Sequence, residues 1–145
     1  MATTVLDVVK HKGYSVVTVA RDQTIASVVA VLTRNKIGAA PVVDDSGRLI
    51  GIISERDIIR GLAEYGYELL ELPVDSLMTC EVVTCSPEHS VVGLMEVMTN
   101  RRIRHLPVFQ NGRLRGIVSI GDVVKQRLAE AQLEVDELRR YISGS

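Results

Sequence analysis

The chain contains the same stretch of sequence twice, and this repeat constrains its fold more than any other feature. Val16–Arg60 aligns with Val82–Lys125, with one turn residue fewer in the second copy. A duplicated unit of this size can pack on itself with pseudo-two-fold symmetry, so clefts between the copies come in related pairs. We therefore look for function in those clefts. The shared positions are Val17/Val83, Thr18/Thr84, Thr33/Thr99, Ile37/Ile103, Pro41/Pro107, Val42/Val108, Gly47/Gly112, Arg48/Arg113, Leu49/Leu114, Gly51/Gly116, Ile52/Ile117, Ser54/Ser119 and Asp57/Asp122.

Length and composition exclude several classes of protein. The 145 residues suffice for one compact domain, and with 46% hydrophobic but only 3% aromatic residues its core must be aliphatic. A net charge of −1, with one Phe, four Tyr and no Trp, gives no basis for nucleic-acid binding. No apolar run approaches the roughly 18 residues that span a membrane, and the N-terminal sequence is not a signal peptide. We predict a cytoplasmic protein with no membrane interaction, in which Cys80 and Cys85 are reduced and bind no metal.

Each copy predicts the order strand, helix, strand, strand, helix. Runs of β-branched residues predict opening strands at Val16–Val19 and Val82–Thr84. Apolar residues spaced i, i+3, i+4, i+7 predict a helix after each strand. The apolar positions are Ile25, Val28, Val29 and Leu32 in the first copy, and Val91, Leu94, Met95 and Met98 in the second. The predicted caps or first-turn charges are Thr24 or Asp22, and Ser90 or Glu88.

A hairpin and a second helix complete each copy. The turn sequences DDSG and QNG join the paired strands, and Asn-Gly readily takes the positive φ that such turns need. The second helix starts at Ser54 or Ser119. Each unit is therefore an α/β (α+β) unit with a small sheet faced by two helices, and two units are expected to pack together. The paired strands are Ala40–Val43 with Leu49–Ser54 and Leu106–Phe109 with Leu114–Ser119, and short helical leads precede the copies at Thr4–Lys12 and Val74–Met78.

The C-terminal segment has the pattern of a coiled coil. Apolar residues recur at alternating spacings of four and three, which is a heptad seam with charged flanks. Such a helix packs either on its own domain or on a partner, and we predict a dimerisation helix over residues 122–142. The seam residues are Val124, Leu128, Ala131, Val135, Leu138 and Ile142.

The two copies resemble a known regulatory domain. The strings IGAAPVVDDSGRLIGIISERDII and IRHLPVFQNGRLRGIVSIGDVV resemble the cystathionine-β-synthase (CBS) domain, and two in tandem resemble a Bateman module. The resemblance implies one module over residues 1–145, with β-α-β-β-α repeats at 5–63 and 74–127 and pseudo-two-fold symmetry. It also implies binding of adenosine-containing ligands such as AMP, ADP, ATP, NAD(H) or S-adenosylmethionine, and a homodimer formed through the CBS faces.

The residues Ser54-x-x-Asp57 and Ser119-x-x-Asp122 lie where a strand leads into a helix. A carboxylate there can accept hydrogen bonds from both ribose hydroxyls, and a hydroxyl at the helix N-terminus can donate to a phosphate. The same spacing is also close to a capping box, which needs no ligand. The two roles are compatible, and within the CBS-like frame we predict ribose sites.

The resemblance implies further ligand contacts, which we list as expectations. Residues near Val16–Thr18 and Val82–Thr84 would contact adenine. Ala39, Ala40 and Pro41, with His105, Leu106 and Pro107, would line the base and sugar pocket, although a proline at a strand edge needs no ligand to explain it. The cluster NRRIRH is often a solvated helix end, but the resemblance implies that Asp57 works with Arg102, Arg104 or His105, with Arg56 near the phosphate.

The two predicted sites differ in charge. Asp122 would face Lys36 and Gly38, where the first site has Arg102 and Arg104. We therefore expect the Asp57 site to favour the ligand with more phosphate charge.

No catalytic motif is evident: the sequence has no nucleophile elbow, phosphate-binding loop or metal-binding His pair. We predict a regulatory sensor that is not an enzyme and has no catalytic cofactor. An adenine nucleotide (AMP, ATP or NAD) would shift its conformation or oligomeric state for an unidentified regulated protein. The alternative is a ligand-independent dimeric interaction scaffold, in which the two carboxylates only cap helices.

Overall fold

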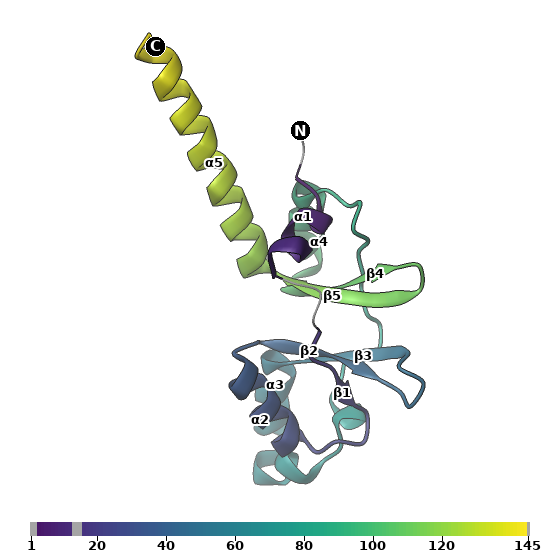
Figure 1. Ribbon diagram of the computed structural model, residues 1–145. Coiled ribbons are helices and arrows are strands. Elements are labelled where there is room, and N and C mark those ends of the chain that lie inside the picture. The colour runs from purple at the N-terminus through teal and green to yellow at the C-terminus, as the bar shows by residue number, and fades with distance from the viewer. Residues whose placement is uncertain (1–2, 13–15, 145) are drawn as a thin grey trace.

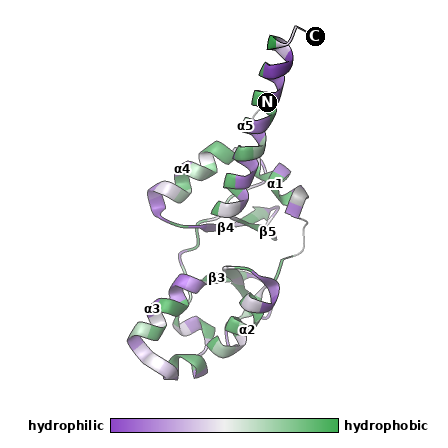
Figure 2. Ribbon diagram, turned by 90° about the vertical axis from the view of Figure 1, so that its left-hand side faces the viewer, coloured by the Kyte–Doolittle hydropathy of each residue, from purple (hydrophilic) through white to green (hydrophobic). Residues whose placement is uncertain are grey.

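The computed structural model describes residues 3–12 and 16–144. Two lobes are stacked on each other, and their small sheets face each other with helices on the outside (Figures 1 and 2). The elements are α1 (Val5–Lys12), β1 (Val19–Ala20), α2 (Ile25–Asn35), β2 (Ala39–Val43), β3 (Leu49–Ser54), α3 (Glu55–Tyr65), the 3-10 helices η1 (Gly66–Glu71) and η2 (Val74–Ser76), α4 (Val91–Arg101), β4 (His105–Gln110), β5 (Arg113–Ser119) and α5 (Ile120–Ile142). This is the predicted α/β fold of two tandem repeats plus a C-terminal helix.

The predicted helix starts are confirmed by side-chain caps. Thr24 Oγ1 accepts from Ser27 N at 3.2 Å before α2, and Ser90 Oγ accepts from Gly93 N at 3.0 Å before α4. A hydroxyl that accepts from the third residue of a helix satisfies one amide that has no partner within the helix. The sequence offered Thr24 or Asp22 and Ser90 or Glu88, and the structure selects Thr24 and Ser90 as the caps.

The hairpins are also confirmed. β2 pairs antiparallel with β3, and β4 pairs antiparallel with β5. The turn between β4 and β5 has Asn111 at φ 53° and Gly112 at φ 74°. Two successive positive φ values match the right-handed twist of the flanking strands, which is why Asn-Gly is found here.

The opening strands differ from the prediction. In the first copy the strand is only Val19–Ala20, and in the second it is reduced to a parallel bridge between Cys85 and Val108. The predicted strand residues Val82 and Val83 instead line a cavity between the lobes. A run of β-branched residues specifies extended backbone but not a pairing partner, so the position of the pairing was not encoded locally.

The two lead segments cross over, so that each packs on the other copy. α1 contributes Val5, Val8 and Val9 to the core of the second repeat. In return, the segment before the second repeat contributes Leu69 and Val74 to the core of the first. Backbone hydrogen bonds fix the exchange, from Val5 N to His89 O at 2.8 Å and from Val74 N to Gln23 O at 2.8 Å. Each lobe is therefore completed by chain from outside its own repeat.

Candidate functional site

Ser54 ends β3 and caps α3, and Asp57 completes the cap. Ser54 Oγ accepts from Asp57 N at 3.3 Å, while Asp57 Oδ2 accepts from Ser54 N and from Ser54 Oγ, each at 3.0 Å. The prediction of a capping box is confirmed. These bonds use only Oδ2 of the carboxylate, and no hydrogen bond from another described residue to Oδ1 is found. The cap therefore leaves one carboxylate oxygen for a ligand.

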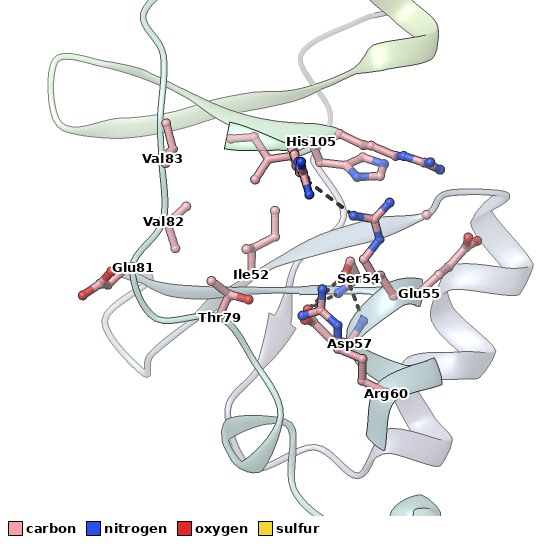
Figure 3. Close-up of a pocket in the computed structure, with 15 residues that line it drawn as sticks. Ile52, Ser54, Glu55, Asp57, Arg60, Thr79, Glu81, Val82, Val83 and His105 are labelled. Carbon is pink, nitrogen blue, oxygen red and sulfur yellow. Dashed lines mark hydrogen bonds between the residues drawn. The ribbon is translucent and has the colours of Figure 1, made fainter. Parts of the chain in front are cut away.

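A cavity of about 220 Å³ opens at this junction, between the two lobes. Figure 3 shows Ser54, Asp57 and Arg60 on the lower wall, His105 on the upper wall, and the chain from Thr79 to Val83 along one side. Both repeats and the segment between them thus build the cavity. Its lining residues are Gly38, Ile52, Ser54, Glu55, Arg56, Asp57, Arg60, Thr79, Glu81, Val82, Val83, Arg102, Ile103, Arg104 and His105.

Arginines from both repeats surround the cavity. Arg56 and Arg60 come from α3, while Arg102 and Arg104 come from the segment after α4. Arg102 is the C-cap of α4 with φ 55°, and its carbonyl accepts from Arg56 Nη1 at 3.5 Å. The ion pairs among the described residues do not involve Asp57, so the predicted cations share its cavity without neutralising it.

The second repeat has the same capping box, but its carboxylate is already paired with a cation through Oδ2. Asp122 Oδ2 accepts from Ser119 N at 2.9 Å and from Lys12 Nζ at 2.8 Å. Burial by itself raises the pKa of Asp122, but the hydrogen bonds from Lys12 and Ser119 outweigh it and hold the pKa below its ordinary value. Lys12 belongs to α1, the lead that crosses to the second repeat. Of the residues expected to face Asp122, Lys36 forms no ion pair with it among the described residues, and Gly38 lines the cavity at Asp57 instead.

In the second cleft, Lys12 also makes the contact that a backbone amide makes in the first cleft. There, Thr79 N donates to Ile52 O at 2.9 Å. In the second cleft, Lys12 Nζ donates to Ile117 O, the counterpart of Ile52, at 2.8 Å. The two clefts thus have equivalent carbonyl acceptors, Ile52 O and Ile117 O, but different groups donate to them. A neutral amide lies beside one cleft and an ammonium group beside the other.

His105 lies between the two clefts and packs over Gly38. A Cβ on Gly38 would lie 3.3 Å from the imidazole ring, so glycine allows the two repeats to approach closely here. Burial is the main cause that lowers the pKa of His105, the nearby Lys12 and Arg104 lower it further, and Glu55 and Asp122 oppose them. The imidazole is therefore neutral at pH 7, and the positive charge of the cavity comes from arginine.

Several predicted ligand contacts lie elsewhere in the structure. The predicted base-pocket residues of β2 and β4 other than His105 are buried, because both faces of these strands are covered. They are Ala39, Ala40, Pro41, Leu106 and Pro107. Thr18 lines a separate cleft between the two hairpins, and Lys36 lines a groove between α2 and α3. Thr84 is exposed and is not among the residues that line the cavity.

The sequence reasoning did not identify Lys12, Arg60, Thr79 or Glu81 as site residues. Arg60 carried a signal, because it follows Asp57 by three residues and so lies on the same side of α3. Lys12, Thr79 and Glu81 carried none. They reach the clefts only because the lead segments cross between the repeats.

Comparison with known proteins identifies the family. The family model for the CBS domain matches residues 5–64 and 74–129. The chain belongs to the CBS-domain family. It is 37% identical to the CBS domain-containing protein CBSX3, mitochondrial, of Arabidopsis thaliana over 99% of this chain and 73% of that protein. CBS-domain pairs are regulatory modules rather than catalytic ones.

Solved structures of CBS proteins share this fold. The CBS-domain containing protein ATU1752 from Agrobacterium tumefaciens superposes with a TM-score of 0.85 at 46% identity, covering 88% of this chain and 95% of that one. The CBS domain pair of protein MJ0100, solved with 5′-methylthioadenosine and S-adenosyl-L-methionine, has a TM-score of 0.76 at 26% identity, covering 90% of this chain and 99% of that one. Within residues 3–12 and 16–144, no helix is both long and apolar enough to cross a membrane.

Proposed function

We propose that this CBS pair is a sensor of an adenosine nucleotide, which binds in the cavity at Asp57. The observation that carries the proposal is the pairing of a carboxylate that has an unused oxygen with arginines from both repeats in one cavity. Asp57 is 9% exposed and is the one buried charged residue in the described part of the chain. Burial of a charge without an ion-pair partner costs free energy, which the hydrogen bonds from Ser54 offset at Oδ2 and which a ligand donor would offset at Oδ1.

The carboxylate and the arginines that line the cavity indicate which groups a ligand should carry. Asp57 Oδ1 accepts a hydrogen bond from a ribose hydroxyl, which is a charge-assisted and therefore strong interaction. The ligand phosphate lies near the guanidinium groups of Arg56, Arg102 and Arg104, which pair with phosphate through two parallel hydrogen bonds. This favours AMP, ADP, ATP or NAD(H) over an adenosine derivative without phosphate.

The Asp122 cleft does not bind the same ligand in this proposal. Its carboxylate already accepts from the Lys12 ammonium group through Oδ2, so a ribose hydroxyl would meet a carboxylate whose charge is already paired, which weakens the hydrogen bond it can form. We infer that one chain binds one nucleotide, at Asp57. From the sequence we expected two sites that differ in charge, and in this proposal the Lys12 ion pair makes them differ in ligand binding.

The signal leaves the module through the arrangement of its two lobes. A ligand that contacts Asp57 in one repeat and Arg104 in the other stabilises the arrangement in which both contacts are made. We propose that a second copy of the chain, and a regulated protein not identified here, respond to that arrangement. A cytoplasmic location remains our prediction from the sequence.

Thermal unfolding in the presence of nucleotides tests the proposal. Ligand-free protein is heated with millimolar AMP, ADP, ATP, NAD or S-adenosylmethionine, and with guanosine and cytidine nucleotides as controls. A ligand at 100 times its dissociation constant adds about 2.7 kcal/mol to the free energy of unfolding, which raises Tm by several degrees. We expect an adenosine-selective rise that is largest for a phosphate-bearing ligand.

The variants Arg104→Gln and Arg101→Gln compare the loss of an arginine that lines the cavity with the loss of a nearby arginine that does not. Both arginines are exposed and nearly adjacent, but only Arg104 lines the cavity. Arg104→Gln should reduce the Tm rise, whereas Arg101→Gln should leave it unchanged. If no adenosine compound raises Tm, the sensor proposal is overturned and the module is the ligand-independent scaffold.

A further inference from the structure

Helix α5 extends well beyond the lobe from which it starts. Its 23 residues measure about 34 Å. Its first turns contact α1, α4 and β5, where Val123 is buried in the core, and Figures 1 and 2 show the C-terminal part of the helix projecting away from both lobes. Helices of this length with one apolar side are stable when that side is covered.

The predicted heptad seam is exposed along its length. The exposed fraction is 66% for Leu128, 60% for Leu138 and 79% for Ile142, while Val124 and Val135 are 44% and 40% exposed. Apolar side chains in a continuous row over this distance mark a surface that another molecule covers. The seam therefore does not pack on its own lobe, which was one of the two readings open from the sequence.

The charged positions beside the seam distinguish two orientations of a second α5. In a parallel pair, Glu134 lies opposite Arg139 of the other copy, and this contact occurs twice. In an antiparallel pair with the seams in full overlap, Lys125 lies opposite the other copy's Arg139, and Glu134 lies opposite its own counterpart. The first arrangement places opposite charges together and the second places like charges together.

Two further observations favour the parallel arrangement. The ion pairs among the described residues leave the side chains of Glu134 and Arg139 without a partner. One core position of the heptad holds Leu128, Val135 and Ile142, and the other holds Val124, Ala131 and Leu138. In the C-terminal half of the seam this places β-branched Val135 and Ile142 at the first position and Leu138 at the second, a combination that favours two parallel strands.

We propose that α5 pairs with α5 of a second copy as a parallel two-stranded coiled coil over residues 124–142. This deepens the proposed association with a second copy and does not depend on the nucleotide. Each chain contributes the same seam, so the two-fold axis of the dimer runs along the coiled coil. The two CBS modules then lie at the same end of the pair.

Disulfide trapping tests the orientation. The background is Cys80→Ser, because Cys80 is exposed, whereas burial raises the pKa of Cys85 to about 12 and keeps its thiol unreactive. In the parallel pair, Leu138→Cys lies beside its own counterpart and forms a covalent dimer on mild oxidation at micromolar protein. In an antiparallel pair, the two copies of residue 138 are about 15 Å apart and residue 138 instead faces residue 128.

The matched variants decide between the outcomes. Arg140→Cys lies on the outer side of the helix, two residues from the seam position, and should give no covalent dimer. A disulfide only in a mixture of Leu128→Cys and Leu138→Cys chains would overturn the parallel orientation. A chain that sediments as a dimer but gives no disulfide at either position would overturn pairing through α5 while leaving self-association intact.

Charge reversal gives an independent readout. Glu134→Arg places like charges together in the parallel homodimer and should weaken self-association about tenfold, as should Arg139→Glu. Glu134→Arg does not weaken the helix itself, since Glu130 and Glu137 are its neighbours on the same chain. An equal mixture of the two variants should associate again, because each chain then meets opposite charges. Homodimers of either variant as stable as the mixed pair would contradict the proposal.

Discussion

The Nζ atom of Lys12 lies 2.8 Å from Asp122 Oδ2, on the carboxylate whose counterpart, Asp57, faces an open cavity. Two repeats with the same strand-to-helix motif therefore present different surfaces to a ligand. The difference comes from α1, which lies outside the aligned part of the repeat.

Removal of the Lys12 charge should open the second cleft. Lys12→Met keeps the length of the side chain but frees Asp122, so titration calorimetry should show the number of nucleotides per chain rising from one towards two. Lys10→Met is the matched control, because Lys10 is exposed on the same helix. If Lys12→Met still binds one nucleotide, the cleft at Asp122 is closed by something other than Lys12.

The Lys12–Asp122 pair should stabilise the protein only above the acid range. The folded-state pKa of Asp122 is lowered, so the unfolded chain binds more protons and stability falls as pH falls. The contribution is complete above the unfolded pKa of about 3.9 and is lost as pH falls through the lower, folded pKa. Partial exposure of both side chains limits it to about 1 kcal/mol.

Urea unfolding at several pH values measures this contribution. The stability difference between the parent and Lys12→Met should be present at pH 7 and should shrink below about pH 4. A difference that stays constant down to pH 2 would show that the two side chains do not interact through charge.

His105 should make stability depend on pH near neutrality. Because its folded-state pKa is lowered, the unfolded chain takes up a proton first as pH falls from about 6.5. Stability is therefore complete above pH 6.5 and declines as pH falls through the lower, folded pKa. His105→Gln should remove this part of the decline in Tm between pH 7.5 and pH 5. An unchanged decline in His105→Gln would assign it to other groups.

The crossed lead segment leaves no room beside Gly61 in α3. A Cβ on Gly61 would lie 2.7 Å from Leu69 Cδ1 and even closer to Leu77, both of which come from the segment before the second repeat. Gly61→Ala should therefore destabilise the protein by about 1–3 kcal/mol, despite the better helix propensity of alanine. Gly121→Ala, in the first turn of α5, meets only Ser119 Oγ at 3.6 Å and should be neutral or stabilising. Urea unfolding compares the two, and equal effects would place the connecting segment away from α3.

Interactions between close neighbours in the chain were predicted from the sequence. The caps by Thr24 and Ser90, the capping boxes at Ser54 and Ser119, and the Asn-Gly turn each involve residues within three positions of one another. The repeat also predicted that the two copies form equivalent strands and helices. The sequence also placed Asp57 with Arg102 and Arg104 in one site, through the resemblance to CBS pairs, and the structure brings these residues to one cavity.

Interactions across the repeats were decided by the tertiary structure. The sequence showed that Leu106 and Ala40 lie in strands, but only the packed sheets show that they face the core and not the cavity. The same holds for Lys12, whose ammonium group reaches Asp122 across 110 positions of the chain.

The sequence by itself thus determined the two repeats, their helix caps and turns, and the motif at each strand-to-helix junction, because each depends on backbone geometry over a few residues. Only the tertiary structure decided that the lead segments exchange partners, that Asp57 faces an open cavity, and that Asp122 pairs with Lys12. The physical reason is that an amphipathic lead such as Val5–Lys12 carries a row of valines but no local signal for the repeat that this row packs against. The choice between the two repeats depends on which long-range packing buries more surface and pairs more buried polar groups.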